Sequence, residues 1–362
     1  MAVLLNPGPV NLSERVRNAL LKPDLCHRER EFSELQNAVR EKLLNVYQLD
    51  NREWAAVLLT GSGTSAMEAM LTSMAGRDQK VLIIENGVYG ERLTQIARLH
   101  AIPCDTLRLG WGEAVAVDRL EEKLSPDIAY VLAVHHETTT GRLNDLAAIA
   151  RAAERRRIPL LVDGVSSFGA EEIRFKDWNI AACAGTANKC LHGVPGISFV
   201  IVNRGLLAAV EPVQRSLYLH LPAYLKQQDA GGTPFTQSVQ VMYALNEALD
   251  EHRDEGGWQR RRETYNTRMK TVRVALEEIN IQPLLNEADC SCVLHSYHLP
   301  RGMSYQSLHD GLKERGFVIY AGQGELAKTI FRISLMGAIG DDDIDRFIKV
   351  MQEILQPPAP GP

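Results

Sequence analysis

The chain has 362 residues and a net charge of −5, and 45% of its residues are hydrophobic and 23% charged. This composition is typical of a globular protein of about two domains and, with no strongly basic region, argues against nucleic-acid binding. No apolar run is long enough for a membrane span, and the first residues lack a basic leader, so we expect a cytoplasmic protein with no membrane partner.

Strands and helices alternate over roughly the first two hundred residues. The expected strands are continuous apolar runs, which is typical of parallel strands covered by helices on both faces. We therefore predict an α/β fold with a mostly parallel sheet sandwiched by helices. The expected strands are 55–60, 80–85, 102–107, 128–134, 158–163 and 196–203, and the expected helices are 65–75, 89–100, 117–124 and one capped by Asn144 that ends near 156.

The pattern changes after about residue 255. A long helix over 257–280 is followed by expected strands at 290–297, 317–321 and 329–335 and by helices at 304–315 and 341–355. We expect a large α/β domain at 16–255, a smaller α+β domain at 256–355, an N-terminal arm at 1–15 that packs on the small domain, and a disordered proline-rich tail at 356–362. A ligand is expected in the cleft between the two domains.

The first chemical feature is the turn Thr60-Gly61-Ser62-Gly63-Thr64, between a strand and a helix. Glycines allow close backbone approach, and free N–H groups at a helix N-terminus attract a phosphate. The signal is weak alone. Gly61-x-Gly63-x-x-Ala66, with Glu85 at the end of the next strand, also fits a dinucleotide-binding fingerprint, so an NAD(P) oxidoreductase is one alternative.

Two further residues fit a covalently bound cofactor. Asp163 ends an apolar strand, at the sheet edge where ligands bind, although an acid there can also be a simple cap. Lys189 follows 26 residues later among small residues, in Gly185-Thr186-Ala187-Asn188-Lys189. A lysine that forms a Schiff base must be partly desolvated, whereas most lysines are only solvated.

Arg332 lies inside the late apolar strand Phe331-Arg332-Ile333. Burying an arginine without a partner is unfavourable. A guanidinium that receives the acid group of a substrate explains this position, and an edge strand with the arginine in solvent is the structural alternative.

Several long segments of the chain match those of a known family. The chain resembles the class V (fold type I) aminotransferases that depend on pyridoxal 5′-phosphate (PLP), and within them the 2-aminoethylphosphonate–pyruvate branch. The resemblance rests on these segments: Asn6-Pro7-Gly8-Pro9, Thr60–Thr64, Asn86-Gly87-Val88-Tyr89-Gly90, His136–Gly141, Asp163 with Ser166–Gly169, Ala187–Cys190, Gly193–Gly196, Phe235-Thr236 and Phe331–Ile333.

The resemblance implies a role for each matched residue. It makes Lys189 the residue that carries PLP and moves the proton, and Asp163 the partner of the ring nitrogen. Arg332 binds the acid group of an amino donor and of a 2-oxo acid in turn, as a ping-pong transfer requires. The remaining implied cofactor contacts are Ser62, Gly63 and Thr64 at the phosphate, Thr139 near the phenolic oxygen, Leu93 over the ring, and Thr236 at the phosphate of the second subunit of a homodimer.

Two departures leave the substrate open. Cys26-His27-Arg28-Glu29-Arg30-Glu31-Phe32 is more similar to the alanine– and serine–glyoxylate branch, and Ala321-Gly322-Gln323 stands where the phosphonate enzymes tend to carry a lysine after the glycine. The expected activity is transfer of the amino group of 2-aminoethylphosphonate to pyruvate, giving phosphonoacetaldehyde and L-alanine. Another donor–acceptor pair on the same fold is the second hypothesis, and a non-catalytic relative that kept the fold is a further one.

Overall fold

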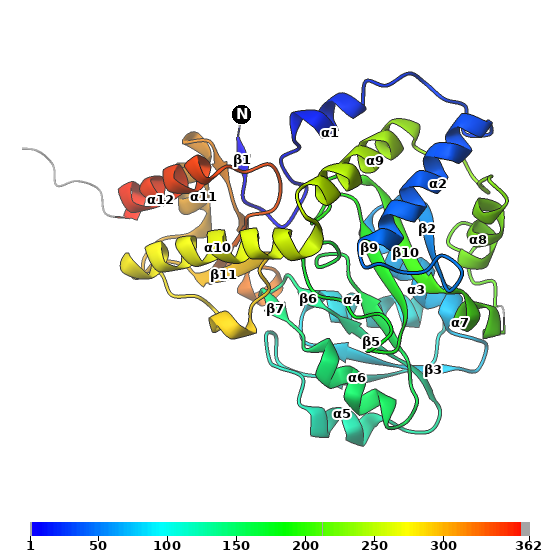
Figure 1. Cartoon of the computed structure of the whole chain (residues 1–362). Coiled ribbons are helices and arrows are strands. Elements are labelled where there is room, and N and C mark those ends of the chain that lie inside the picture. Colours follow the sequence, from blue (N-terminus) through cyan, green and yellow to red (C-terminus); the bar gives the residue numbers. More distant parts are fainter. Residues whose placement is uncertain (1, 212, 356–362) are drawn as a thin grey trace, which may run out of the picture.

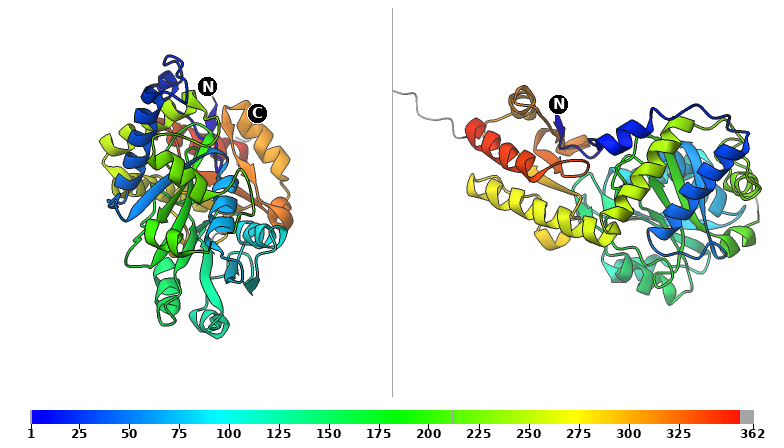
Figure 2. Two further views of the ribbon diagram at one scale, coloured as in Figure 1. Left: turned by 90° about the vertical axis from the view of Figure 1, so that its right-hand side faces the viewer. Right: turned by 45° about the horizontal axis from the view of Figure 1, so that its top comes forward.

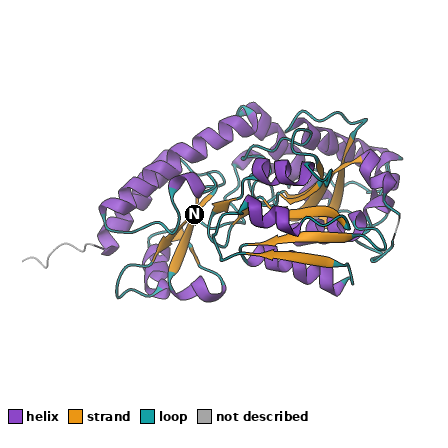
Figure 3. Ribbon diagram, turned by 90° about the horizontal axis from the view of Figure 1, so that it is seen from below, coloured by secondary structure: helices purple, strands orange, loops and turns teal. Residues whose placement is uncertain are grey.

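The structure, a computed structural model, describes residues 2–211 and 213–355. A large unit contains a seven-stranded sheet, and a smaller unit contains a three-stranded sheet; the strands form these two groups in Figure 3. Helix α10 (Gly257–Glu278) begins beside the large unit and runs along the small one (Figure 1). The expected tail at 356–362 lies outside the described residues.

The seven-stranded sheet has the order β2-β10-β9-β8-β5-β3-β4. Its strands are parallel except β10, which runs antiparallel to both of its neighbours. The prediction of a mostly parallel sheet in an α/β fold is therefore confirmed. The strands are β2 (Trp54–Gly61), β3 (Lys80–Glu85), β4 (Cys104–Arg108), β5 (Ile128–Val134), β8 (Leu160–Asp163), β9 (Ile180–Thr186) and β10 (Gly196–Asn203).

Helices cover both faces of this sheet, and each face has its own apolar core. On one face pack α2 (Arg30–Asn45), α5 (Val117–Lys123), α6 (Leu146–Glu154) and α9 (Val239–Asp254). On the other pack α3 (Gly63–Met74), α4 (Val88–Leu99), α7 (Arg204–Ala209) and α8 (Leu221–Asp229). Because both faces are buried, the strands are continuously apolar, as their sequences indicated.

The small unit is a three-stranded antiparallel sheet in the order β11-β14-β13, with helices on one face. Val3 and Leu5 belong to its core, and the N-terminal strand β1 (Val3–Leu4) pairs in parallel with β12 (Phe317–Val318). Figure 2 shows α10 and this unit standing away from the large one. The other elements are β11 (Leu294–His298), β13 (Tyr320–Ala321), β14 (Ile330–Ser334), α11 (Tyr305–Glu314) and α12 (Asp341–Leu355).

Some local expectations were wrong. The cap of α6 is Asp145, whose side chain accepts from the N–H of Ala148, because Asn144 is used elsewhere. The Asn144 amide instead donates to the backbone oxygen of Val134 and exchanges bonds with Asn86. The strand expected over 317–321 is split between two sheets. The remaining short elements are α1 (Glu14–Ala19), β6 (His136–Glu137) and β7 (Arg142–Leu143). Among the described residues, no helix combines the length and apolarity that a membrane crossing requires.

Candidate active site

Asp163 is the last residue of β8, in the middle of the large sheet, and its side chain is buried. Its Oδ1 accepts a hydrogen bond of 2.9 Å from the backbone N–H of Val165. Burial raises the pKa of Asp163 to about 6, while the cations of Arg92 and Lys189 act to lower it. A carboxyl group in this state ionises readily against a positive partner, such as a protonated ring nitrogen.

Lys189 lies in the loop between β9 and β10, at the same edge of the sheet as Asp163. Burial lowers the pKa of Lys189 to about 8, and the nearby Arg332 cation lowers it further, whereas the charge of Asp163 raises it. The amine is therefore partly in its free, nucleophilic form near neutral pH. The structure thus brings together Lys189, Asp163 and Arg332, which lie far apart in the sequence.

The N-terminal segment lies against the lysine. Lys189 Nζ donates a hydrogen bond to the backbone oxygen of Pro7. Gly8 has a φ of +110°, and a Cβ placed there would lie 2.9 Å from Cδ of Lys189. Only glycine suits both the backbone conformation and this close approach. The Asn-Pro-Gly-Pro segment is therefore a wall of the lysine site.

The turn predicted to bind phosphate is at the N-terminus of α3. Ser62 is the N-cap residue and is exposed, and its side chain makes no capping hydrogen bond. The N–H of Ser65 bonds to the backbone oxygen of Ser62 at 2.9 Å, but the Ser62 side chain satisfies none of the first N–H groups, and the helix dipole adds a partial positive charge. Gly63 is buried, and a Cβ there would lie 2.7 Å from Cγ1 of Val165, the residue two after Asp163. The turn and the acid are therefore direct neighbours.

Arg92 is a candidate site residue that the sequence did not indicate. It lies on α4, and one terminal nitrogen is 3.4 Å from Oγ1 of Thr64, the last residue of the phosphate turn. Its guanidinium also covers the ring of Tyr89, 4.7 Å from the centroid. In the sequence, the one sign of this role is the position of Arg92, two residues after the Asn86–Gly90 segment. Only the tertiary structure brings it to the turn.

Leu93 is placed differently from Tyr89 on the same helix. Leu93 is fully buried in the apolar core between α4 and the sheet. Tyr89, one turn earlier, is half-buried and stacks beneath Arg92 at the edge of the phosphate turn. Residues four apart share one face of a helix, so the difference arises because Tyr89 is in the first turn of α4, at the edge of the sheet, and Leu93 is one turn further in. Tyr89 interacts with both Arg92 and Arg332, two of the cations near Lys189.

Thr139 is held in a buried network at the N-terminus of α4. Its Oγ1 lies 2.6 Å from Oε1 of Glu137 and accepts from the N–H of Val88 at 3.0 Å. The other carboxylate oxygen of Glu137 accepts from the N–H groups of Tyr89 and Gly90. Burial raises the pKa of Glu137 to about 7. Thr139 and Glu137 therefore fix the start of the helix that carries Arg92.

Arg332 lies on β14 of the small unit, buried, with its side chain directed toward the large unit. Its Nε donates to the backbone oxygen of Ala321 at 2.8 Å, and NH1 donates to the backbone oxygen of Thr138 at 2.9 Å. Burial lowers the pKa of Arg332 from its ordinary value. Gln323, which follows β13, places its amide oxygen 3.4 Å from Oγ1 of Thr139. The small unit therefore brings a buried cation and a neutral amide against Thr138 and Thr139 of the large unit.

Thr236 is exposed in the loop before α9, and no described residue is hydrogen-bonded to its side chain. The next residue, Gln237, contacts Oγ1 of Thr60 at 3.1 Å, so the loop lies beside the phosphate turn. Arg28, from the unusual segment at 26–32, donates to the backbone oxygen of Thr233 at 3.4 Å. That segment therefore packs on the loop that carries Thr236.

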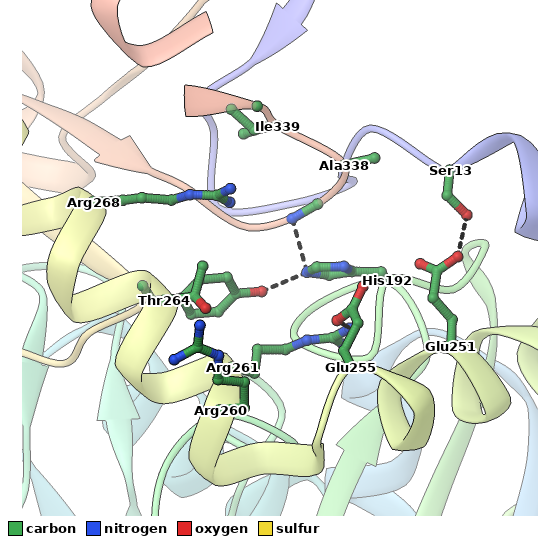
Figure 4. A pocket seen from close by; sticks show the side chains of 13 residues that line it. Ser13, His192, Glu251, Glu255, Arg260, Arg261, Thr264, Arg268, Ala338 and Ile339 are labelled. Carbon is green, nitrogen blue, oxygen red and sulfur yellow. Dashed lines mark hydrogen bonds and ion pairs between the residues drawn. The ribbon is translucent and has the colours of Figure 1, made fainter. Parts of the chain in front are cut away.

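A cavity of about 590 Å³ lies behind the lysine loop, between α10 and the segment at 337–340 (Figure 4). His192, three residues after Lys189, lines it. The Nε2 atom of His192 accepts from the N–H of Gly337 at 2.8 Å and contacts the hydroxyl of Tyr265, and the dashed lines in Figure 4 mark these bonds. None of Asp163, Lys189 and Arg332 lines this cavity. His192 ties the lysine loop to the small unit.

The arrangement suits PLP, which offers a phosphate, a ring nitrogen and an aldehyde. An uncapped helix N-terminus with Arg92 suits the phosphate, Asp163 suits the ring nitrogen, and Lys189 suits the aldehyde. The carboxyl ends of β2, β8 and β9, which carry these groups, lie at one edge of the sheet. The fold and site define a PLP-dependent transferase of fold type I.

Comparison with known proteins identifies the family. Residues 15–347 match the family described as aminotransferase class V, so the chain belongs to the class V aminotransferases, which depend on PLP. The chain is 34% identical over 360 residues to the 2-aminoethylphosphonate–pyruvate transaminase of Vibrio vulnificus (strain YJ016), covering 98% of this chain and 97% of that one. It is 33% identical over 357 residues to the enzyme of the same name from Bacteroides fragilis (strain YCH46), covering 97% and 98%.

Solved structures agree with this assignment. The aspartate aminotransferase of subgroup IV from Thermus thermophilus superimposes with a TM-score of 0.88 at 29% identity, covering 98% of this chain and 99% of that one. The alanine–glyoxylate aminotransferase from Nostoc sp. superimposes with a TM-score of 0.91 at 25% identity, covering 98% and 95%. The dinucleotide-binding alternative for the Gly61–Ala66 segment is thereby overturned.

Proposed function

We propose that the chain transfers the amino group of 2-aminoethylphosphonate to pyruvate, giving phosphonoacetaldehyde and L-alanine. The observation that carries the proposal is Arg332, a buried cation directed toward the large unit and close enough to Lys189 to lower its pKa. An acid group that enters such a partly dry site needs a charged, bidentate partner. The names of the two relatives from Vibrio vulnificus and Bacteroides fragilis support this choice of donor and acceptor.

PLP, when bound, supplies the carbonyl that takes up the amino group and a ring that draws electrons from the substrate carbon. Lys189 would hold it and, once released, would remove and return a proton at Nζ. Asp163 would keep the ring nitrogen protonated. Arg332 would bind the acid group of donor and acceptor in turn, so that one site serves both half-reactions.

Ser62, Gly63 and Thr64 would hold the cofactor phosphate, with Arg92 adding a positive charge. Thr139 would lie near the phenolic oxygen, fixed by Glu137. For the residue over the ring, the half-buried Tyr89 fits better than Leu93, whose side chain fills the core between α4 and the sheet.

A homodimer is part of the proposal. Leu217 is 76% exposed and Tyr218 is 39% exposed, and the Tyr218 hydroxyl donates to the backbone oxygen of Thr60 at 2.9 Å, beside the phosphate turn. A second copy of the chain would cover this apolar surface and bring its own Thr236 toward the neighbouring site. Sedimentation should give a dimer; an active monomer in dilute solution would refute this arrangement.

A second substrate pair, alanine with glyoxylate, is favoured by one observation. Gln323 puts a neutral amide against Thr139 where a lysine would help to neutralise a phosphonate. The experiment that separates the two is a comparison of kcat/KM for 2-aminoethylphosphonate with pyruvate and for alanine with glyoxylate. We expect the higher kcat/KM for 2-aminoethylphosphonate with pyruvate. If alanine with glyoxylate is preferred by more than about tenfold, roughly 1.4 kcal/mol of transition-state preference, the second pair replaces the first.

A further inference from the structure

Ser296 faces Arg332 directly across two strands of the small sheet. β11 and β14 are antiparallel, and Ser296 is the register partner of Arg332. Side chains directly opposite each other in such a pair point to the same face, with Cβ atoms about 4.5–5.5 Å apart. The hydroxyl of Ser296 is therefore on the face of the sheet from which the guanidinium reaches the large unit.

This hydroxyl is buried but has no hydrogen-bond partner among the described residues. A buried polar group without a partner is unfavourable and uncommon. The next pair on the same face makes the contrast clear, because the hydroxyl of Ser334 donates to the backbone oxygen of Val293 at 2.8 Å. Ser296 therefore has an unused donor beside Arg332, and a group bound to this guanidinium would supply its missing partner.

Some N–H groups of the Arg332 guanidinium are not used in hydrogen bonds to the protein. Arginine has five N–H groups, and the bonds to Ala321 and Thr138 use one at Nε and one at NH1. The remaining ones, on NH1 and NH2, form a fork for two oxygens of an acid group. A carboxylate has only two oxygens, and the fork can satisfy both. A phosphonate has a third oxygen, which the fork leaves without a donor.

We infer that Ser296 is a specificity-determining residue, whose hydroxyl donates to the third oxygen of a phosphonate held by Arg332. The inference rests on the proposed function and explains how a site with one arginine and a neutral Gln323 distinguishes a tetrahedral acid group from a planar one. A carboxylate substrate, such as pyruvate, binds through the fork and does not need Ser296. The same site then accepts both partners of the reaction.

The test uses the PLP-loaded protein and two donors with the same carbon chain. These are 2-aminoethylphosphonate and 3-aminopropanoate, in which a carboxylate replaces the phosphonate. Ser296→Ala should lower kcat/KM for 2-aminoethylphosphonate by about tenfold or more, the usual effect of losing a hydrogen bond to a charged group, and should change that for 3-aminopropanoate by less than about threefold. Equal losses for both donors, or no loss for either, would overturn the inference.

The matched control is Ser334→Ala, which removes a hydroxyl that has a partner on the same face. It should lower the melting temperature and leave the ratio of the two donors unchanged. Ser296→Ala should not lower the melting temperature of the unliganded protein, because its hydroxyl has no partner to lose. A purely structural role for Ser296 would give the opposite pattern.

A binding measurement keeps this inference separate from the proposed function. Ethylphosphonate and propanoate lack the amino group and are compared as inhibitors. Ser296→Ala should weaken ethylphosphonate by about tenfold and leave propanoate unchanged, even if another amino donor proves to be the substrate. If the unaltered protein binds ethylphosphonate no better than the variant does, the inference is wrong whatever the donor is.

Discussion

The guanidinium of Arg332, on the small sheet, donates a 2.9 Å hydrogen bond to the backbone oxygen of Thr138, in the turn between β6 and β7 of the large unit. The residue proposed to bind the substrate is thus attached to both units. Any change in how the units meet also changes the position of this cation relative to Lys189. The proposed roles of Arg332 and Lys189 would therefore be coupled through this one side chain.

Replacing Arg332 by lysine keeps the positive charge but removes the planar fork. Arg332→Lys should therefore lower kcat/KM by about tenfold or more for the donor and for pyruvate alike, while PLP stays bound. Steady-state kinetics and the cofactor absorbance measure the two effects. The exposed Arg315→Lys serves as control and should behave like the unaltered protein; a loss confined to one substrate would argue against a shared acid-group site.

Asp163→Asn keeps the shape of the side chain but cannot hold a proton on the ring nitrogen by charge. The variant should fold and retain some PLP, yet lose most of its transaminase activity, because the ring draws electrons less strongly. Activity per bound cofactor is the quantity to measure. Turnover close to normal would show that Asp163 has another role.

The lowered pKa of Lys189 predicts how cofactor uptake depends on pH. Below about pH 8 the amine is mostly protonated and unreactive, and above it the free amine dominates. The rate of PLP capture by the cofactor-free protein should rise with pH and level off above about 8, instead of rising through the ordinary value of 10.5. Because the Arg332 cation contributes to the shift, Arg332→Gln should move the midpoint upward; a midpoint near 10.5 in the unaltered protein would contradict the burial of the amine.

Arg92 should contribute to binding the cofactor phosphate. Arg92→Gln removes the cation beside Thr64, so the dissociation constant of PLP should rise by about tenfold, with a smaller effect on turnover at saturating PLP. Equilibrium titration of the cofactor-free protein measures this. Arg98→Gln, on an exposed position of the same helix, is the matched control. Equal affinities for PLP in both variants would remove Arg92 from the site.

Much of the site could be predicted because the residues stand at recognisable points of the chain. Asp163 ends an apolar strand, Lys189 lies among small residues, and the glycines of the phosphate turn join a strand to a helix. These positions depend on local sequence, and the alternation of strands and helices correctly predicted the class of fold.

The other features depend on tertiary contacts that no local pattern reports. Pro7 contacts Lys189 across 182 positions in the sequence, and the pairing of Ser296 with Arg332 follows from strand register. The difference in burial between Leu93 and Tyr89 is also tertiary, because the two residues share one face of α4 and only their distance from the end of the sheet separates them. Arg92 was overlooked because an arginine on an amphipathic helix is usually on the solvated face.

The central claim is that Lys189 carries the cofactor, and it can be tested directly. The PLP-loaded protein should show a visible absorbance band that borohydride bleaches, and peptide mass mapping of the reduced protein should find the pyridoxyl phosphate on Lys189. Lys189→Ala should lose both the band and the modified peptide. Modification of a different lysine, or a protein that binds no PLP, would contradict the account.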